Sequence, residues 1–186
     1  MPVYQIALFL HIVGALGMFA GLALEWVALS ALRRVSTIEQ AREWSTIYRT
    51  LRVIGPASLG LLLVFGLYLM ATAWGATAWI VLGILGFFAM AGLGAFNGIQ
   101  LTRTLDALSG SGQLPARARE VLRRSAFVLS LRVRIALGLA IVLLMTVKPD
   151  LVAALVLVAA ALALGAGSMV LGTSRAPAAV RSGQPT

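Results

Sequence analysis

The chain has 186 residues, of which 60% are hydrophobic and 11% charged, with a mean hydropathy of +0.97. Soluble domains carry about 25% charged residues, so this composition excludes a disordered chain and argues against a soluble domain. The net charge is +9, but long uncharged runs separate the basic residues, which favours a membrane protein over a nucleic-acid-binding one. There is no cysteine and a single histidine, His11, which excludes disulfides, zinc–thiolate sites, iron–sulfur clusters and histidine clusters within one chain.

Five apolar segments are long enough to cross a membrane, which takes about 20 apolar residues. They lie at about residues 4–32, 53–73, 78–100, 127–147 and 151–173. None shows the polar stripe of a soluble amphipathic helix. The sequence therefore predicts an all-α integral membrane protein, with one transmembrane domain over residues 1–173 that forms a five-helix bundle. We expect the first segment to be retained, because residues 1–5 lack the basic side chains of a secretory signal.

The basic residues are concentrated in alternate connections. Fourteen of the 15 Lys and Arg residues lie in or beside residues 33–52, residues 101–126 and the tail, and only Lys148 lies on the opposite side. Cytoplasmic loops carry an excess of basic residues, so the N-terminus is predicted outside and the C-terminus inside. The tail, residues 174–186, contains proline and glycine and is predicted to be disordered.

Both predicted cytoplasmic loops, residues 33–52 and 101–126, are expected to be partly helical. Ser36-x-x-Glu39 has the pattern of a capping box. The helix after it has a rough apolar face, so we expect it to lie at the membrane surface and to end at Gly55-Pro56. In the second loop, Pro115 suits the first turn of a helix that could run unbroken into the fourth span.

His11 lies about 10 Å below Tyr4 in the first span, where an imidazole needs a partner. Three interpretations stay open: a hydrogen bond to the backbone of a neighbouring helix, ligation of a metal or haem, and proton transfer. Met70 and Met145 lie at a similar depth, and thioether and imidazole ligands suit Cu(I), although methionine also fills gaps in apolar cores. The candidate cofactor residue is thus His11, and the candidate metal site is His11 with Met70 and Met145.

Glu25 is the one acidic residue within an apolar run, and it lies near the inner end of the first span. Arg132 and Arg134 lie at a similar level in the fourth span. Because an acid near lipid should pair with a cation, we favour a structural ion pair between Glu25 and one of these arginines. A proton or substrate site and simple exposure at the interface are the alternatives.

Small residues suggest where the helices pack. His11, Gly14, Met18, Gly21 and Glu25 follow a 3-4-3-4 spacing and share one helix face, which indicates a packing seam rather than a cofactor groove. Gly94-x-x-x-Gly98, with Asn97 between the two glycines, also permits a close helix approach.

Several short motifs suggest a family. They are Leu10-His11 with Gly14, Gly66, Trp79, Leu114-Pro115 before Arg123-Arg124-Ser125, and Met145-Thr146-Val147-Lys148-Pro149. Through them the chain resembles the bacterial integral membrane protein family of unknown function 2269, which is distantly related to the copper-resistance-D group. The resemblance covers roughly residues 4–150 and leaves the fifth span outside it. It implies a membrane-bundle fold, and the related groups imply copper or haem, for which His11 is the available position.

The sequence contains no serine triad, nucleotide-binding loop or pair of catalytic carboxylates. It therefore predicts a non-enzymatic protein of the bacterial cytoplasmic (inner) membrane, acting as a structural or accessory subunit of a membrane assembly or as a homo-oligomer. Copper or haem binding through His11 is one alternative, and a small-molecule or proton transporter that uses Glu25 is another. The expected partners are the bilayer and anionic lipid at the cytoplasmic face, without nucleic acid.

Overall fold

The computed structural model describes the backbone of residues 2–173 and the side chains of residues 3–168. The predicted disordered tail, residues 174–186, lies outside the described residues. The elements in chain order are α1 (Pro2–Leu32), α2 (Ile38–Leu69), the π-helical turn η1 (Met70–Trp74), α3 (Ala78–Asp106), α4 (Ala116–Arg123), α5 (Ser125–Val147) and α6 (Leu151–Thr173).

Within the described residues, five helical segments are long and apolar enough to cross a membrane. This confirms the predicted all-α fold with five spans, and the chain is a multi-pass membrane protein. Helices suit this role because each backbone N–H and C=O in hydrocarbon must find its partner inside the protein. Helix α6 has the predicted bounds, whereas α3 continues six residues beyond its predicted end at residue 100.

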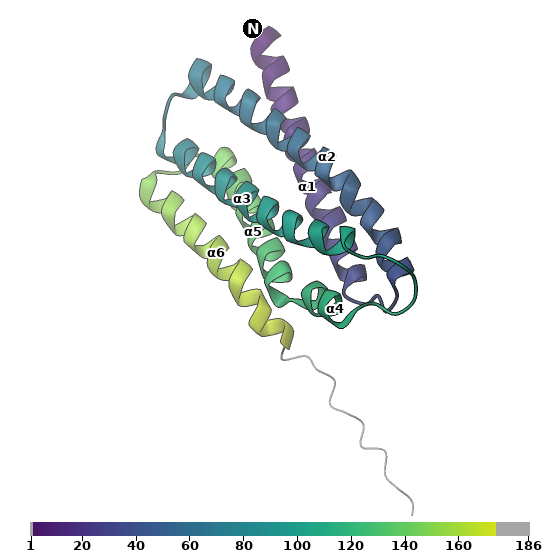
Figure 1. Ribbon diagram of the computed structural model, residues 1–186. Coiled ribbons are helices and arrows are strands. Elements are labelled where there is room, and N and C mark those ends of the chain that lie inside the picture. Colours follow the sequence, from purple (N-terminus) through teal and green to yellow (C-terminus); the bar gives the residue numbers. More distant parts are fainter. Residues whose placement is uncertain (1, 174–186) are drawn as a thin grey trace, which may run out of the picture.

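The helices form two groups (Figure 1). Helices α1 and α2 pack side by side as an antiparallel hairpin, and α3 and α6 pack against α5. Helix α5 also contacts α1 and so joins the two groups. The α1–α2 and α3–α4 connections lie at one end of the bundle, and the α2–α3 and α5–α6 connections lie at the other.

Glycines set the close contacts between neighbouring helices. A Cβ added to Gly14 in α1 would lie 2.9 Å from the backbone nitrogen of Leu62 and 3.0 Å from the carbonyl oxygen of Ser58 in α2.

The contact between α3 and α5 also depends on glycines. In α3, a Cβ on Gly83 would lie 3.0 Å from the Met145 methyl group, and one on Gly94 would lie 2.9 Å from Arg134 Nη1. These contacts fix the antiparallel register of α1 with α2 and of α3 with α5.

The start of α2 differs from the sequence prediction in its cap. Thr37 is the N-cap residue, and its hydroxyl accepts a hydrogen bond from the Gln40 backbone N–H at 3.3 Å. Gln40 in turn accepts from the Ser36 N–H at 3.1 Å. The predicted box of Ser36 and Glu39 is therefore wrong by one residue, because Glu39 instead accepts a hydrogen bond from the Gly112 N–H at 2.9 Å.

Helix α2 also runs without interruption past Gly55 and Pro56, where the sequence predicted an end. A proline inside a helix removes one backbone hydrogen bond, which membrane helices tolerate when neighbouring helices support them. The first half of α2 does not lie alone at a surface, because Ile38, Ala41 and Tyr48 are buried in a cluster with residues of α1, α3 and α4.

The two predicted cytoplasmic loops pair with each other around this cluster. Thr37 and Gln113 form an isolated antiparallel bridge. Its backbone hydrogen bonds join the Ile38 N–H to the Gly112 carbonyl and the Leu114 N–H to the Ser36 carbonyl, each at 2.9 Å. The chain then forms α4, but Arg124 has a non-helical ψ of 127°. The continuous helix from Pro115 into the fourth span is therefore replaced by α4 and α5 with a break between them.

Candidate ligand cavity

A cavity of about 470 Å³ lies among α1, α2, α3 and α5. This volume is within the range of small-molecule sites, roughly 300–1,000 Å³. The lining side chains with polar groups are His11 and Thr146, and the other lining residues are apolar or glycine. Thr146 donates its hydroxyl proton to the Val142 carbonyl at 2.8 Å. The cavity therefore suits an apolar molecule with one or two polar atoms.

His11 contacts α2 through one edge of its imidazole ring. Nδ1 lies 3.0 Å from the Leu62 carbonyl oxygen. A carbonyl oxygen only accepts, so Nδ1 carries the proton and Nε2 has a free lone pair. Gly66 makes this approach possible, since a Cβ there would lie 3.0 Å from His11 Cε1 and 3.2 Å from Nδ1. The bond to a neighbouring helix is thus present, and it leaves Nε2 available to accept a hydrogen bond or to bind a metal.

The methionines divide into two levels along the cavity. A Cβ on Gly138 of α5 would lie 3.5 Å from the Met18 methyl group of α1. His11 precedes Met18 by two helical turns and Met145 follows Gly138 by two, so the antiparallel register places His11 and Met145 at one level. Met18 and Met90 also line the cavity, and Met18 lies about 10 Å deeper than His11.

Met70 is separate from this arrangement. It is not among the cavity-lining residues, and it packs against the cluster of Trp79, Ile80, Leu144 and Ala154. Of the candidate metal site, the structure therefore brings His11 and Met145 to one cavity and leaves Met70 outside it. No group of three or more His, Asp or Glu side chains in the described part of the chain is placed to hold a metal ion.

Haem and copper differ in how well this cavity could hold them. Haem carries two propionate groups that need cationic or polar partners, and no Lys or Arg lines the cavity, so the lining does not fit haem. Cu(I) is a soft ion that thioether and imidazole groups bind, and the lining provides both at the level of His11 and Met145.

Glu25 and Arg134 form a buried ion pair between α1 and α5, with side chains 14% and 7% exposed. Tyr48 of α2 donates a hydrogen bond to the same Glu25 oxygen at 3.4 Å. The pair thus joins three helices. Neither Glu25 nor Arg134 lines the cavity, so the geometry gives Glu25 a structural partner rather than access to a bound molecule.

Arg132, the other candidate partner, turns to α6. Its Nη1 donates to the Ser168 carbonyl at 2.6 Å, and its guanidinium lies 5.8 Å from the centre of the Trp26 ring. Arg132 and Arg134 are two residues apart on a helix and point about 200° apart, so one residue cannot pair with both.

Three buried donors around Arg134 have no protein partner among the described residues: Asn97 Nδ2, Ser130 Oγ and Arg134 Nε. Ser130 lies one turn before Arg134 on α5, and the register set by Gly94 and Arg134 places Asn97 level with Ser130. Unpaired buried donors are costly, and a bound water with two to four polar neighbours satisfies such groups. Sequence reasoning noted Asn97 but missed Ser130, because a serine within an apolar run does not reveal which face it occupies.

The comparisons with known proteins give no relative. No protein-family model, no curated protein and no solved structure matches the chain. The resemblance to family 2269 therefore stays a prediction.

Proposed function

We propose that the chain is a non-enzymatic membrane protein that binds a small lipophilic molecule in the cavity among α1, α2, α3 and α5. The single observation behind this proposal is a cavity of about 470 Å³ whose lining is apolar apart from His11 and Thr146. Apolar lining supplies affinity, and a few placed polar groups select the ligand's orientation.

The hydrogen-bonding state of the lining narrows the class of ligand. His11 Nδ1–H is committed to the Leu62 carbonyl, and the Thr146 hydroxyl proton is committed to the Val142 carbonyl. Both side chains then offer lone pairs and no proton. The complementary molecule carries a hydrogen-bond donor, so an apolar alcohol or phenol fits better than a ketone, ether or quinone.

The proposal is tested with 2-naphthol and its methyl ether, which has the same ring system without the donor. Binding is measured by equilibrium dialysis against protein in lipid nanodiscs, with empty nanodiscs subtracted. We expect 2-naphthol to bind more tightly than the ether. The variant His11→Phe should weaken 2-naphthol about fivefold, since one hydrogen bond contributes about 1 kcal/mol.

A second pair of variants tests the place of binding. Ala15 lines the cavity, whereas Ala23 is an exposed residue on the same helix. Ala15→Leu should fill part of the cavity and weaken both probes, and Ala23→Leu should leave both unchanged. The proposal is refuted if wild type binds the two probes equally and if neither His11→Phe nor Ala15→Leu changes the binding of either probe.

Copper binding is the second candidate, because His11 and Met145 line one cavity at one level. His11 Nε2 and the Met145 thioether would hold Cu(I), which needs no charged ligand. Under anaerobic loading with Cu(I) and dialysis, this candidate predicts about one copper per chain, lost in Met145→Leu. The same variant keeps the cavity apolar and should leave 2-naphthol binding intact, so the two functions are separable.

We also infer that the N-terminus lies outside and the basic connections lie in the cytoplasm, because 14 of the 15 Lys and Arg residues fall on one side. With the resemblance to family 2269, this supports the bacterial inner membrane as the location. A role as an accessory subunit or homo-oligomer stays a prediction, and co-purification of a stable larger complex from native membranes would support it.

A further inference from the structure

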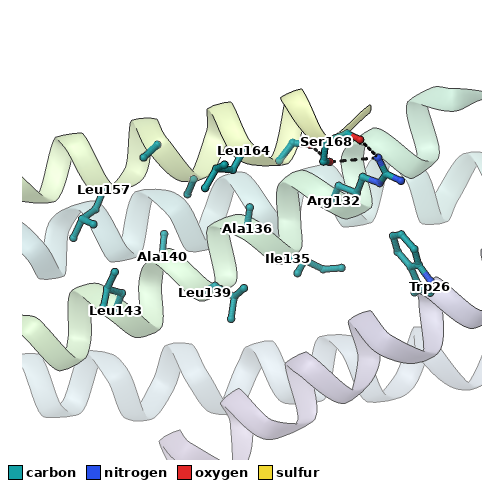
Figure 2. A pocket seen from close by; sticks show the side chains of 13 residues that line it. Trp26, Arg132, Ile135, Ala136, Leu139, Ala140, Leu143, Leu157, Leu164 and Ser168 are labelled. Carbon is teal, nitrogen blue, oxygen red and sulfur yellow. Dashed lines mark hydrogen bonds between the residues drawn. The ribbon is translucent and has the colours of Figure 1, made fainter. Parts of the chain in front are cut away.

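A groove of about 570 Å³ lies along α5 and α6 on the opposite side of α5 from the ion pair, and its two ends differ in chemistry (Figure 2). Arg132, Ser168 and Trp26 lie at one end, and Leu143 and Leu157 lie at the other. Between these ends the lining consists of leucine, isoleucine, alanine and glycine. The groove is thus apolar along its length and cationic at one end.

The length of the groove corresponds to one leaflet. From Arg132 to Leu143 the helix rises roughly 16 Å, at 1.5 Å per residue. The hydrocarbon core of a bilayer is about 30 Å thick, so one leaflet contributes about 15 Å. The groove is therefore long enough for a single acyl chain. Because Arg132 lies five residues inside the predicted span 127–147, a chain that reaches Leu143 would pass the middle of the membrane by about 9 Å.

The charge of Arg132 lacks a carboxylate partner. Arg134 is neutralised by Glu25. Among the described residues, Arg132 contacts the neutral Ser168 carbonyl and hydroxyl and the Trp26 ring. Only Nη1 is used in these hydrogen bonds, which leaves Nε and Nη2 without a partner among residues 3–168. A cation within a span is expensive unless an anion or polar group meets it.

We propose that this groove binds one anionic phospholipid, with its phosphate on Arg132 and one acyl chain between α5 and α6. Arginine reaches toward the headgroup level by extending its side chain, and its planar fork matches the oxygens of a phosphate. Trp26 is suited to the same level, where aromatic rings lie at the membrane interface. With the basic connections inside, the lipid belongs to the inner leaflet, whose anionic lipids attract basic side chains.

The test is native mass spectrometry of the full chain released from nanodiscs with equal amounts of phosphatidylglycerol and phosphatidylcholine. Wild type should retain one phosphatidylglycerol in preference to phosphatidylcholine. In Arg132→Gln this preference should fall about fivefold, equivalent to about 1 kcal/mol for one basic side chain near the surface. Arg123→Gln removes the same charge from an exposed residue of α4 outside the groove and should change nothing.

A second pair of variants separates the groove from the charge and covers the case in which Arg132→Gln fails to fold. Ala161 lines the groove, and the neighbouring Ala159 is exposed outside it. Ala161→Phe should abolish retention of the lipid, whereas Ala159→Phe should not. Added inorganic phosphate should not displace the lipid, because the acyl chain supplies much of the contact.

Three results would overturn the proposal. They are equal retention of the two lipids by wild type, unchanged retention in Ala161→Phe, and a lipid-free dimer, which would assign the groove to a second copy of the chain.

Discussion

Two arginines that lie two residues apart on α5 have different partners, and helix geometry explains the difference. Arg134 faces α1 and pairs with Glu25, whereas Arg132 faces α6 and donates to the Ser168 carbonyl. The sequence indicates that Glu25 needs a cationic partner. Both arginines lie at a similar depth in the membrane to Glu25, so depth does not decide which of them is the partner. The 100° turn per residue excludes a shared partner, and only the packing of α1 against α5 selects Arg134.

The ion pair between Glu25 and Arg134 leads to a stability prediction. Glu25→Ala leaves the buried Arg134 charge without its carboxylate, and loss of one member of a buried pair costs about 3–5 kcal/mol. Chemical unfolding in dodecyl maltoside, followed by circular dichroism, should show this loss. The double variant Glu25→Leu with Arg134→Leu should recover much of it, since apolar replacements of a buried pair are often tolerated.

The exposed pair of Arg49 and Asp106 is the matched control. Its atoms lie 3.6 Å apart, and its side chains are 70% and 52% exposed. Asp106→Asn should cost less than about 1 kcal/mol, because solvent screens such pairs. A similar cost for Asp106→Asn and Glu25→Ala would show that the buried pair has no special structural role.

At the scale of the helices, the spacing of glycines predicted which helix faces pack together. It did not predict which glycine allows the close contact between two helices. Gly17 and Gly21 form a small-residue motif in α1, but no atom lies within 4 Å of a Cβ added to Gly21. Gly17 does lie against Ser58 of α2, and the other close approach to α2 is at Gly14, outside the motif. A spacing motif marks a helix face, and the crossing point of two helices depends on their register, which the sequence of one helix does not contain.

These glycines give a matched pair of substitutions. Gly14→Ala places a methyl group against the backbone of α2 at Leu62 and Ser58, which requires one helix to move and should cost about 1–3 kcal/mol. Gly21→Ala meets no such obstacle and should gain up to about 1 kcal/mol from helix propensity. Thermal unfolding of both variants in nanodiscs checks this order, and a greater loss for Gly21→Ala would contradict the assignment of the close α1–α2 contact to Gly14.

The ends of the helices were the hardest elements to predict. Gly55-Pro56 is an ordinary signal for a helix end. Burial of residues before it, such as Tyr48, and after it, such as Ser58 and Leu69, holds α2 within the bundle on both sides. The pairing of Ser36–Ile38 with Gly112–Leu114 joins segments far apart in the chain. Thr37-x-x-Gln40 has the same local pattern as Ser36-x-x-Glu39, and the long-range contact of Glu39 with the Gly112 N–H selects between them.

For the whole molecule, the sequence was sufficient to predict the number of spans because that number depends on hydropathy and length alone. The cavity was not predictable in the same way. His11, Met18, Met90 and Met145 come from three helices, and their common lining depends on the register of α1, α3 and α5. The position of Met70 along its span made it a candidate ligand beside His11, but position along a span does not show which direction a side chain faces.

The proposed orientation is testable in the intact protein because the chain has no cysteine. Single cysteines at Ala76 and Ser111, both exposed in connections at opposite ends of the bundle, can be labelled in whole cells with a maleimide that does not cross membranes. We expect Ala76→Cys to react in intact cells and Ser111→Cys to react only after lysis, because the basic connections are cytoplasmic. The reverse order of labelling would place the N-terminus in the cytoplasm.

The most direct test of the ligand cavity uses the single histidine of the chain. Protein with ¹⁵N-labelled histidine in lipid bilayers should give one pair of imidazole signals by solid-state nuclear magnetic resonance, with Nδ1 protonated and Nε2 unprotonated. Addition of 2-naphthol should shift the Nε2 signal, whereas its methyl ether should not. A protonated Nε2 in the free protein, or an Nε2 signal unchanged by saturating 2-naphthol, would contradict the account of His11 as the polar anchor of the cavity.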